Sequence, residues 1–137
     1  MIEFEILAEP YGKGRPRFTR GGHAYTPEKT RAYEKLVQDE YIRQTGGGMY
    51  EGPMEVFIKA TCRVPKSGTK KDRERKLQGF ILPTKKPDCD NIAKTILDAL
   101  NGIAYKDDSQ IVSLHVYKVY GEAGKVEVIL RRMKVDE

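Results

Sequence analysis

The sequence predicts an α/β fold of the α+β kind, with one mixed β-sheet of about four strands packed against helices. Segments in which apolar and polar residues alternate lie near both ends and in the middle of the chain, and segments with helical apolar spacing lie between them. The length of 137 residues suits one domain over residues 1–137, which can bury roughly two thirds of the surface that the unfolded chain exposes.

The first half of the chain predicts a strand, a loop and a helix, in that order. Residues 2–6 place apolar side chains at every second position, which is typical of a strand with one buried face. Residues 10–24 are rich in glycine and basic residues and predict a loop. A helix should begin at Thr26-Pro27-Glu28, where Thr26 can cap and Pro27 suits the first position, and it should end at residues 46–48, which are all glycine.

The middle of the chain predicts a second strand and then a basic segment. Residues 54–62 alternate more regularly than any other part of the sequence and predict a strand. Residues 63–76 predict part helix and part loop. Residues 85–88 must be extended, because Pro87 disfavours the helical conformation of the residue before it.

The last third predicts a helix and two strands. Residues 90–101 have helical spacing, and Asn101-Gly102 should end the helix in a left-handed conformation. Residues 111–120 and 125–131 both predict strands. The short link between them, residues 121–124, predicts that the two strands form a hairpin.

Composition favours an intracellular protein and is compatible with a polyanionic partner. The formal net charge is +5 and the sequence pI about 9.1, which is consistent with nucleic acid but also common among small domains. Cys62 and Cys89 have no metal-ligand spacing, so a reduced protein in the cytoplasm is expected. No apolar run approaches the ~20 residues that span a bilayer, and we expect no membrane partner.

Acidic residues concentrate in one segment of this basic chain. No glutamate lies within residues 88–108, but five of the eight aspartates do: Asp88, Asp90, Asp98, Asp107 and Asp108. Neighbouring like charges raise one another's pKa and cost stability, and a divalent cation removes that repulsion. Aspartate oxygens suit Mg²⁺, which prefers one or two carboxylates together with water and substrate phosphates. The segment therefore predicts a magnesium site.

The spacing within this segment supports the metal hypothesis. Asp88 and Asp90 can face one ion, because residues two apart in an extended chain point the same way. On a helix, Asp90, Lys94 and Asp98 share one polar stripe opposite an apolar face. A strand that begins at Ile111 beside this helix should bring Asp108 back to the metal.

Each acidic residue also has a structural interpretation. Asp88 or Asp90 could cap the helix, and Asp90, Lys94 and Asp98 could form an ordinary ladder of ion pairs. Asp107 and Asp108 could belong to a turn. The combination favours the metal site.

Basic residues in two loops and one helical segment are candidates for contacts with DNA phosphates. The candidates are Lys13, Arg15, Arg17, Arg20, Lys70, Lys71, Lys85 and Lys86, with Arg73, Arg75 and Lys76 adjoining the second group. The alternative for the segment around Lys70 is a solvated helix face. Phe18 and Tyr25 could stack on unpaired bases or anchor the first loop to the core, whereas His23 and His115 have no metal-like partners nearby in sequence.

Motifs over residues 10–112 resemble the RusA family of Holliday junction resolvases. The central motif comprises Lys86-Pro-Asp-Cys-Asp-Asn-Ile-Ala-Lys, Leu97-Asp-Ala-Leu-Asn-Gly and Asp107-Asp-Ser-Gln, and Lys13-Gly-Arg-Pro-Arg with Tyr25-Thr-Pro is similar to the family's opening segment. The resemblance implies a dimeric, Mg²⁺-dependent enzyme that nicks opposing strands of a four-way DNA junction.

The resemblance also implies roles for individual residues. The family's three essential acids fall on Asp88, Asp90 and Asp108, which would hold the metal, and its essential lysine falls on Lys94. Either member of the pair Asp107-Asp108 could be the third ligand. We expect two-fold symmetry for the dimer, with its interface on apolar surface of the strands or of the first helix.

Two other functions compete with the nuclease. A noncatalytic basic module that binds DNA would explain the cations but leave the acidic segment without a purpose. A metal-dependent phosphatase would use the same acids on small phosphoesters and ignore DNA topology.

Overall fold

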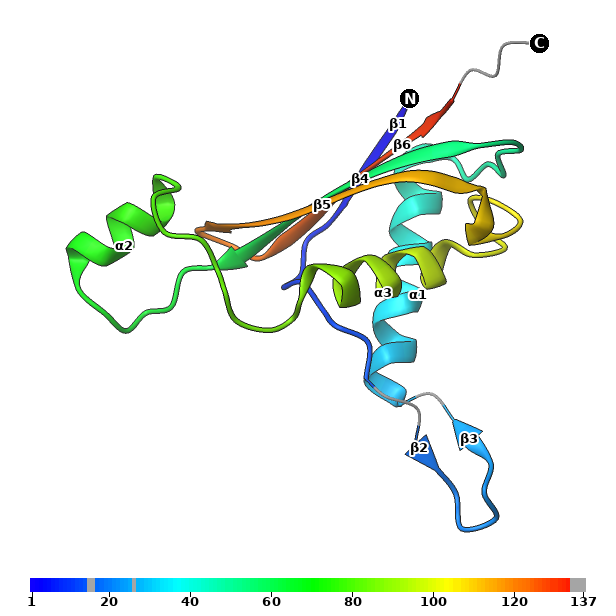
Figure 1. The fold of residues 1–137 in the computed structure, drawn as a ribbon, viewed down its shortest axis with the longest axis horizontal. Helices are drawn as coiled ribbons and strands as arrows, with labels where there is room; N and C mark the ends of the chain where they lie inside the picture. The colour runs from blue at the N-terminus through cyan, green and yellow to red at the C-terminus, as the bar shows by residue number, and fades with distance from the viewer. Residues whose placement is uncertain (15–16, 26, 134–137) are drawn as a thin grey trace.

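The computed structural model describes residues 1–14, 17–25 and 27–133, which form one mixed sheet with two helices on one face (Figure 1). The elements of the sheet are β1 (Ile2–Ile6), β4 (Met54–Arg63), β5 (Ile111–Gly121) and β6 (Lys125–Arg132), in the order β1-β6-β4-β5. β4 is parallel to β5 and antiparallel to β6, and β1 is antiparallel to β6. The predicted α+β class and the mixed four-stranded sheet are confirmed.

Three helices and a short hairpin complete the described chain. The helices are α1 (Glu28–Thr45), α2 (Lys70–Leu77) and α3 (Cys89–Leu100), and a 3₁₀ turn, η1 (Asp108–Gln110), precedes β5. The two-stranded hairpin, β2 (Arg17–Phe18) and β3 (Ala24–Tyr25), occupies the second half of the segment predicted to be a loop, residues 10–24, and ends one residue beyond it. Both the hairpin and α2 project away from the sheet (Figure 1).

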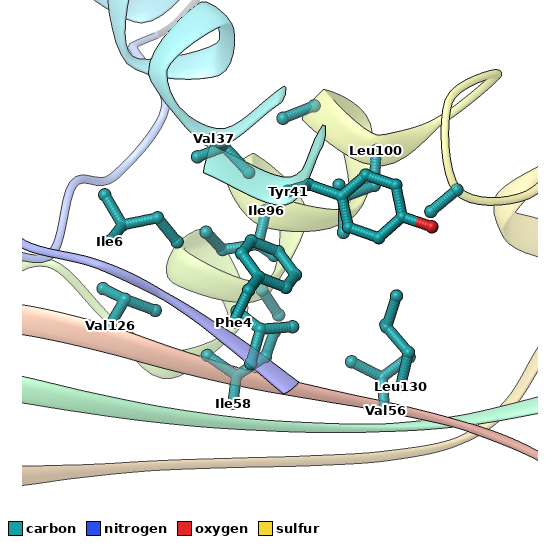
Figure 2. Close-up of a cluster of buried hydrophobic side chains, with 14 of the residues drawn as sticks. Phe4, Ile6, Val37, Tyr41, Val56, Ile58, Ile96, Leu100, Val126 and Leu130 are labelled. Carbon is teal, nitrogen blue, oxygen red and sulfur yellow. The ribbon is translucent and has the colours of Figure 1, made fainter. Parts of the chain in front are cut away.

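The core lies between the sheet and the two helices α1 and α3. Figure 2 shows side chains from the sheet and from both helices meeting there: Phe4, Ile6, Val37, Tyr41, Val56, Ile58, Ile96, Leu100, Val126 and Leu130. The apolar face of α3 is buried as its spacing predicts, and the regular alternation of residues 54–62 buries its apolar side chains on the helix side. Burial of side chains of this size contributes about 1.5–3 kcal/mol each.

The ends of the helices follow simple backbone chemistry. α1 ends at Gly46, whose φ of 85° is left-handed and whose N–H donates to the carbonyl of Ile42. At the end of α3, Gly102 alone has a positive φ, and Asn101 is extended. At the start of α1, Pro27 precedes the first helical residue and Thr26 lies outside the described residues.

The predicted hairpin of the last two strands is wrong. β5 and β6 do not pair with each other, because β4 lies between them and pairs with both. β4 is buried on the helix side from Met54 to Cys62, and on its other face Glu55 and Thr61 are buried too. An interior place in the sheet gives β4 a hydrogen-bonded neighbour at both edges, and a β5–β6 hairpin would have left one edge of β4 unpaired.

A polar cluster covers the outer face of β4 close to β5. The buried Glu55 accepts hydrogen bonds from Ser113 (3.0 Å), from His115 Nε2 (3.1 Å) and from Arg131. Burial acts to raise the pKa of Glu55, but these hydrogen bonds outweigh it and lower the pKa. His115 also stacks on Phe57 at 4.5 Å between ring centroids, so it has a structural role in this strand.

Candidate active site

The acidic segment begins in a loop that a lysine of the sheet holds in place. Lys118 of β5 donates from Nζ to the carbonyl of Lys85 (2.6 Å) and to that of Pro87 (3.0 Å). These bonds fix the segment immediately before Asp88, where the chain bends at residues 85–87, although an extended conformation was predicted. Asp88 itself is extended and immediately precedes α3. Sequence reasoning missed Lys118. The sequence does carry one indication of it: Leu114, Val116 and Lys118 occupy every second position of the strand, so a charged residue stands where the alternation predicts an apolar one.

A second loop packs on the same end of α3. Asn91 donates from Nδ2 to the carbonyl of Lys13 (3.2 Å), and Gly12 lies against Asn91 and Pro87. A pocket of about 360 Å³ opens here and is lined in part by Gly12, Asp88 and Asn91. Asn91 therefore joins the first basic loop to the start of α3, beside the acidic pair.

Gly12 is required by this close approach. A Cβ at residue 12 would lie 2.6 Å from Asn91 Nδ2 and 2.8 Å from Pro87 Cβ, whereas at Gly14 in the same loop the nearest atom would be 3.4 Å away. We expect Gly12→Ala to lower the free energy of unfolding by about 1–3 kcal/mol, because overpacking displaces its neighbours. Thermal melts of Gly12→Ala and of the control Gly14→Ala measure this. Equal melting temperatures would contradict the packing shown here.

The five clustered aspartates fall into two groups. Two are engaged within the protein: Asp98 pairs with Lys13 at 2.9 Å, and Asp107 accepts hydrogen bonds from the backbone and side chain of Ser109 as the cap of η1. These contacts raise the pKa of Lys13 and lower that of Asp107. The turn interpretation therefore holds for Asp107.

The other three aspartates, Asp88, Asp90 and Asp108, are exposed. Among the side chains that the structure describes, which exclude those of residues 15–18, 25, 26 and 134–137, none forms an ion pair with them, and the Asp88 carboxylate makes no cap hydrogen bond. Neither the capping interpretation of Asp88 nor the ion-pair ladder of Asp90, Lys94 and Asp98 is realised, because Lys94 points into solvent unpaired with either acid and Asp98 binds Lys13. Hard oxygen ligands with no competing protein partner fit the donor set that Mg²⁺ prefers.

The three exposed aspartates do not lie close together within one chain. Asp88 follows Pro87, which Lys118 holds near the end of β5, whereas Asp108 lies just before the start of β5 at Ile111. Seven strand residues at ~3.3 Å each separate these two places by roughly 23 Å. Within the described residues, no group of three or more His, Cys, Asp or Glu side chains is close enough to hold a metal ion.

The orientation of α3 explains this separation. α3 runs antiparallel to β5, so its start lies near Lys118 and its end lies near η1 (Figure 1). Tyr105 donates a hydrogen bond to the carbonyl of Leu97, which lies in the last turns of α3 (2.6 Å). Burial raises the pKa of Tyr105, and the nearby negative charge of Asp108 raises it further. Asp108 therefore lies beside the end of α3, and Asp88 and Asp90 lie at its start.

The candidate DNA contacts occupy different parts of the molecule. Arg20 is exposed in the turn of the β2–β3 hairpin, and Lys85 and Lys86 are exposed beside Asp88. Lys70 and Lys71 are exposed on α2, which buries none of its residues. Lys13 is half-buried in its pair with Asp98, which gives it a structural role in holding the first loop to α3.

Some of the candidates lie outside the described part of the chain. This applies to Arg15 as a whole and to the side chains of Arg17, Phe18 and Tyr25. None of the described helices is long and apolar enough to cross a membrane.

A family model described as Endodeoxyribonuclease RusA matches residues 8–131, nearly the whole chain. The chain belongs to the RusA family. A relative from Bacillus subtilis (strain 168), named Uncharacterized protein YqaN, is 38% identical over 137 residues, covering 96% of each chain. Membership in the RusA family implies endodeoxyribonuclease activity, and the matched range contains every element of the acidic segment.

Proposed function

We propose that this RusA-family chain is a Mg²⁺-dependent, structure-selective endodeoxyribonuclease of the cytoplasm. In this proposal one domain, residues 1–137, forms a homodimer that resolves four-way DNA junctions by paired nicks in recombination and repair. The observation that carries the proposal is the division of the aspartates: Asp98 and Asp107 have protein partners, whereas Asp88, Asp90 and Asp108 present unengaged carboxylates. These three are the residues on which the family's essential acids fall.

The proposed metal site requires two chains. Asp88 and Asp90 lie at one end of β5 and Asp108 at the other, so one ion cannot bind all three within a single chain. A two-fold axis across β5 would supply Asp108 from the partner to Asp88 and Asp90, and would generate two equivalent sites. Two such sites match a reaction with two symmetric nicks.

The proposed chemistry divides between the ion and the protein. Mg²⁺ held by the three carboxylates would supply charge to the phosphate and a water of lowered pKa. Lys94 lies one helical turn beyond Asp90 and is exposed, so its ammonium can approach the phosphate and stabilise developing negative charge. Lys85 and Lys86 add positive charge beside Asp88, which favours the DNA backbone at this end of α3.

Cleavage of a synthetic four-way junction tests the function. We expect paired nicks in the junction with Mg²⁺, none with chelator, and little cutting of a linear duplex of the same sequence. A noncatalytic DNA-binding module would shift the junction in a gel and cut nothing under any condition. A phosphatase would hydrolyse a small phosphoester such as p-nitrophenyl phosphate and leave the junction intact.

We propose that α2 contacts DNA phosphates. It has eight residues, five of them basic, buries none of them and projects beyond the sheet (Figure 1), so the structure assigns it no role in the core. Replacing Lys70 and Lys71 by Gln should reduce the slope of log affinity against log salt by about 1.8 if both contact phosphates. The control replaces Lys29 and Lys35 of α1. Junction titrations at several salt concentrations measure the slopes, and an unchanged slope for α2 would assign it to a solvated face.

A further inference from the structure

An exposed phenylalanine follows α2 at a position that backbone hydrogen bonds fix. Gly79 has a left-handed φ of 85°, and its N–H donates to the carbonyl of Lys76 (3.2 Å). The N–H of Phe80 donates to the carbonyl of Arg75 (3.0 Å). This pair of hydrogen bonds is a glycine-based cap that ends many helices. The backbone of Phe80 is therefore tied to α2, yet 72% of the residue's surface is exposed.

α2 offers this phenylalanine no apolar partner. In a cap of this kind, an apolar side chain two residues past the cap often packs on the last turns of the helix. In α2 the residues at those positions are Glu74 and Arg75, and the helix buries none of its residues. Leu82, two residues beyond Phe80, is exposed as well (54%). Two large apolar side chains thus face solvent beside a basic helix.

The charge beside this apolar surface narrows the class of ligand. Five of the eight residues of α2 are basic, and Lys85 and Lys86 follow in the same connection to α3. A ligand of this segment should combine negative charge with a flat apolar face. Nucleic acids have both, since their phosphates pair with basic side chains and their bases stack on aromatic rings.

Contacts with β5 place α2 at the same end of the sheet as the first acids of the proposed metal site. Lys76 Nζ lies 5.2 Å from the centroid of the Tyr120 ring, near the end of β5. Two residues earlier in β5, Lys118 holds the carbonyl of Pro87, directly before Asp88. α2 extends beyond this end of the sheet (Figure 1). DNA that is bound at Asp88 and continues past this end would meet α2.

Stacking on a base would favour branched DNA over a linear duplex. Each base of a linear duplex is covered on both faces by its neighbours, so an aromatic side chain must first unstack it at a free-energy cost. That cost is smallest where pairing or stacking is already interrupted, as it is where the arms of a junction meet. An aromatic ring near the proposed site would therefore gain more from a branch point than from a continuous duplex.

We propose that Phe80 stacks on a base at the branch point of the DNA, and that this contact determines the preference for branched over linear substrates. The inference rests on the proposed function, since it assumes a branched DNA substrate. It goes beyond the phosphate contacts of α2, because phosphates are common to linear and branched DNA, and it assigns the discrimination to one side chain.

Binding of a Phe80→Ala variant to two DNAs tests this proposal. Gel shifts in chelator compare a four-way junction with a linear duplex of the same sequence. We expect Phe80→Ala to bind the junction about 10-fold more weakly than the parent, because one stacking contact is lost, and to bind the duplex as the parent does. The salt dependence of both affinities should be unchanged, since no phosphate contact is removed. Ile42→Ala is the control, because it removes a large exposed side chain (49%) from α1.

Two further substitutions at the same position separate stacking from a general apolar contact. Phe80→Trp supplies another aromatic ring and should keep the junction preference. Phe80→Leu keeps apolar bulk without a π-face and should bind the junction as weakly as Phe80→Ala. Thermal melts and circular dichroism should match the parent for all three variants, because the side chain is exposed.

The outcomes separate the role of Phe80 from the proposed nuclease. A folded Phe80→Ala variant that keeps the parental junction preference, or that loses affinity equally for both DNAs, overturns the branch-point contact and leaves the nuclease intact. Parental junction affinity of Phe80→Leu overturns stacking. Binding of the parent but not of Phe80→Ala to vesicles of phosphatidylserine and phosphatidylcholine, with junction binding unchanged, would assign Phe80 to a membrane surface instead. A parent that prefers the junction but cuts neither DNA with Mg²⁺ overturns the nuclease, while the affinities still decide the role of Phe80.

Discussion

An Asp90→Asn variant is expected to fold, to bind a four-way junction and to cut it about 1,000-fold more slowly than the parent. Asp90 is exposed in the first turn of α3 and has no ion-pair partner in the described residues, so the amide removes no stabilising contact. It does remove one negative ligand from the proposed metal site. Junction affinity should stay the same or rise slightly, because a negative charge near the phosphates is lost.

A structural role for Asp90 would give the opposite result. As a helix cap or half of an ion pair, Asp90 would contribute up to ~1 kcal/mol to stability and nothing to chemistry. Asp39→Asn is the matched control, because it removes the same charge from an exposed helix position, where Asp39 pairs with Lys35. Thermal melts, gel shifts and cleavage rates decide, and parental cutting by a stable Asp90→Asn protein would exclude Asp90 from the metal site.

A mixture of two inactive variants should regain activity. Asp90→Asn disables the site that uses Asp88 and Asp90 of the same chain. Asp108→Asn disables the site that uses Asp88 and Asp90 of the other chain. In a mixed dimer with shared sites both substitutions fall in one site and the other site is intact. An equal mixture that exchanges subunits should recover about a quarter of the parental sites, each nicking one strand, since half of the dimers are mixed.

Sites contained within one chain give a different result, because every site of the mixed dimer would carry one substitution. Nicking by the mixture is followed on a junction with one labelled strand at a time. The control mixes Asp88→Asn with Asp90→Asn, which disables the same half of the site in both chains and should recover nothing. Recovery in this control, or none in the Asp90→Asn and Asp108→Asn mixture, would contradict sharing.

The sequence predicted where the strands and helices lie along the chain better than it predicted which strands pair in the sheet. Alternation of apolar residues is a local signal, so it located the strands near residues 2–6 and 54–62. It carries no information on which strands pair, and the short link at residues 121–124 favoured a hairpin that the interior position of β4 prevents.

The candidate site shows the same limit. The clustering of aspartates in the sequence pointed to Asp88, Asp90 and Asp108, whose carboxylates the structure leaves unengaged. The sequence did not reveal that α3 and β5 run in opposite directions, which separates Asp108 from the other two. Nor did it identify Lys118, whose contacts with the Lys85 and Pro87 carbonyls join residues 31 or more positions apart.

The place of β6 in the sheet governs when this protein can fold during its synthesis. β6 is synthesised after the other three strands of this sheet, yet it lies between β1 and β4 and pairs residue 130 with residue 2. Until it emerges, β1 has no neighbour in the sheet and one edge of β4 is open. Contacts so distant in sequence slow folding, because the chain must close long loops before it gains any stabilisation. The sheet of the nascent chain therefore stays incomplete until residues 125–132 have been synthesised and can insert between β1 and β4.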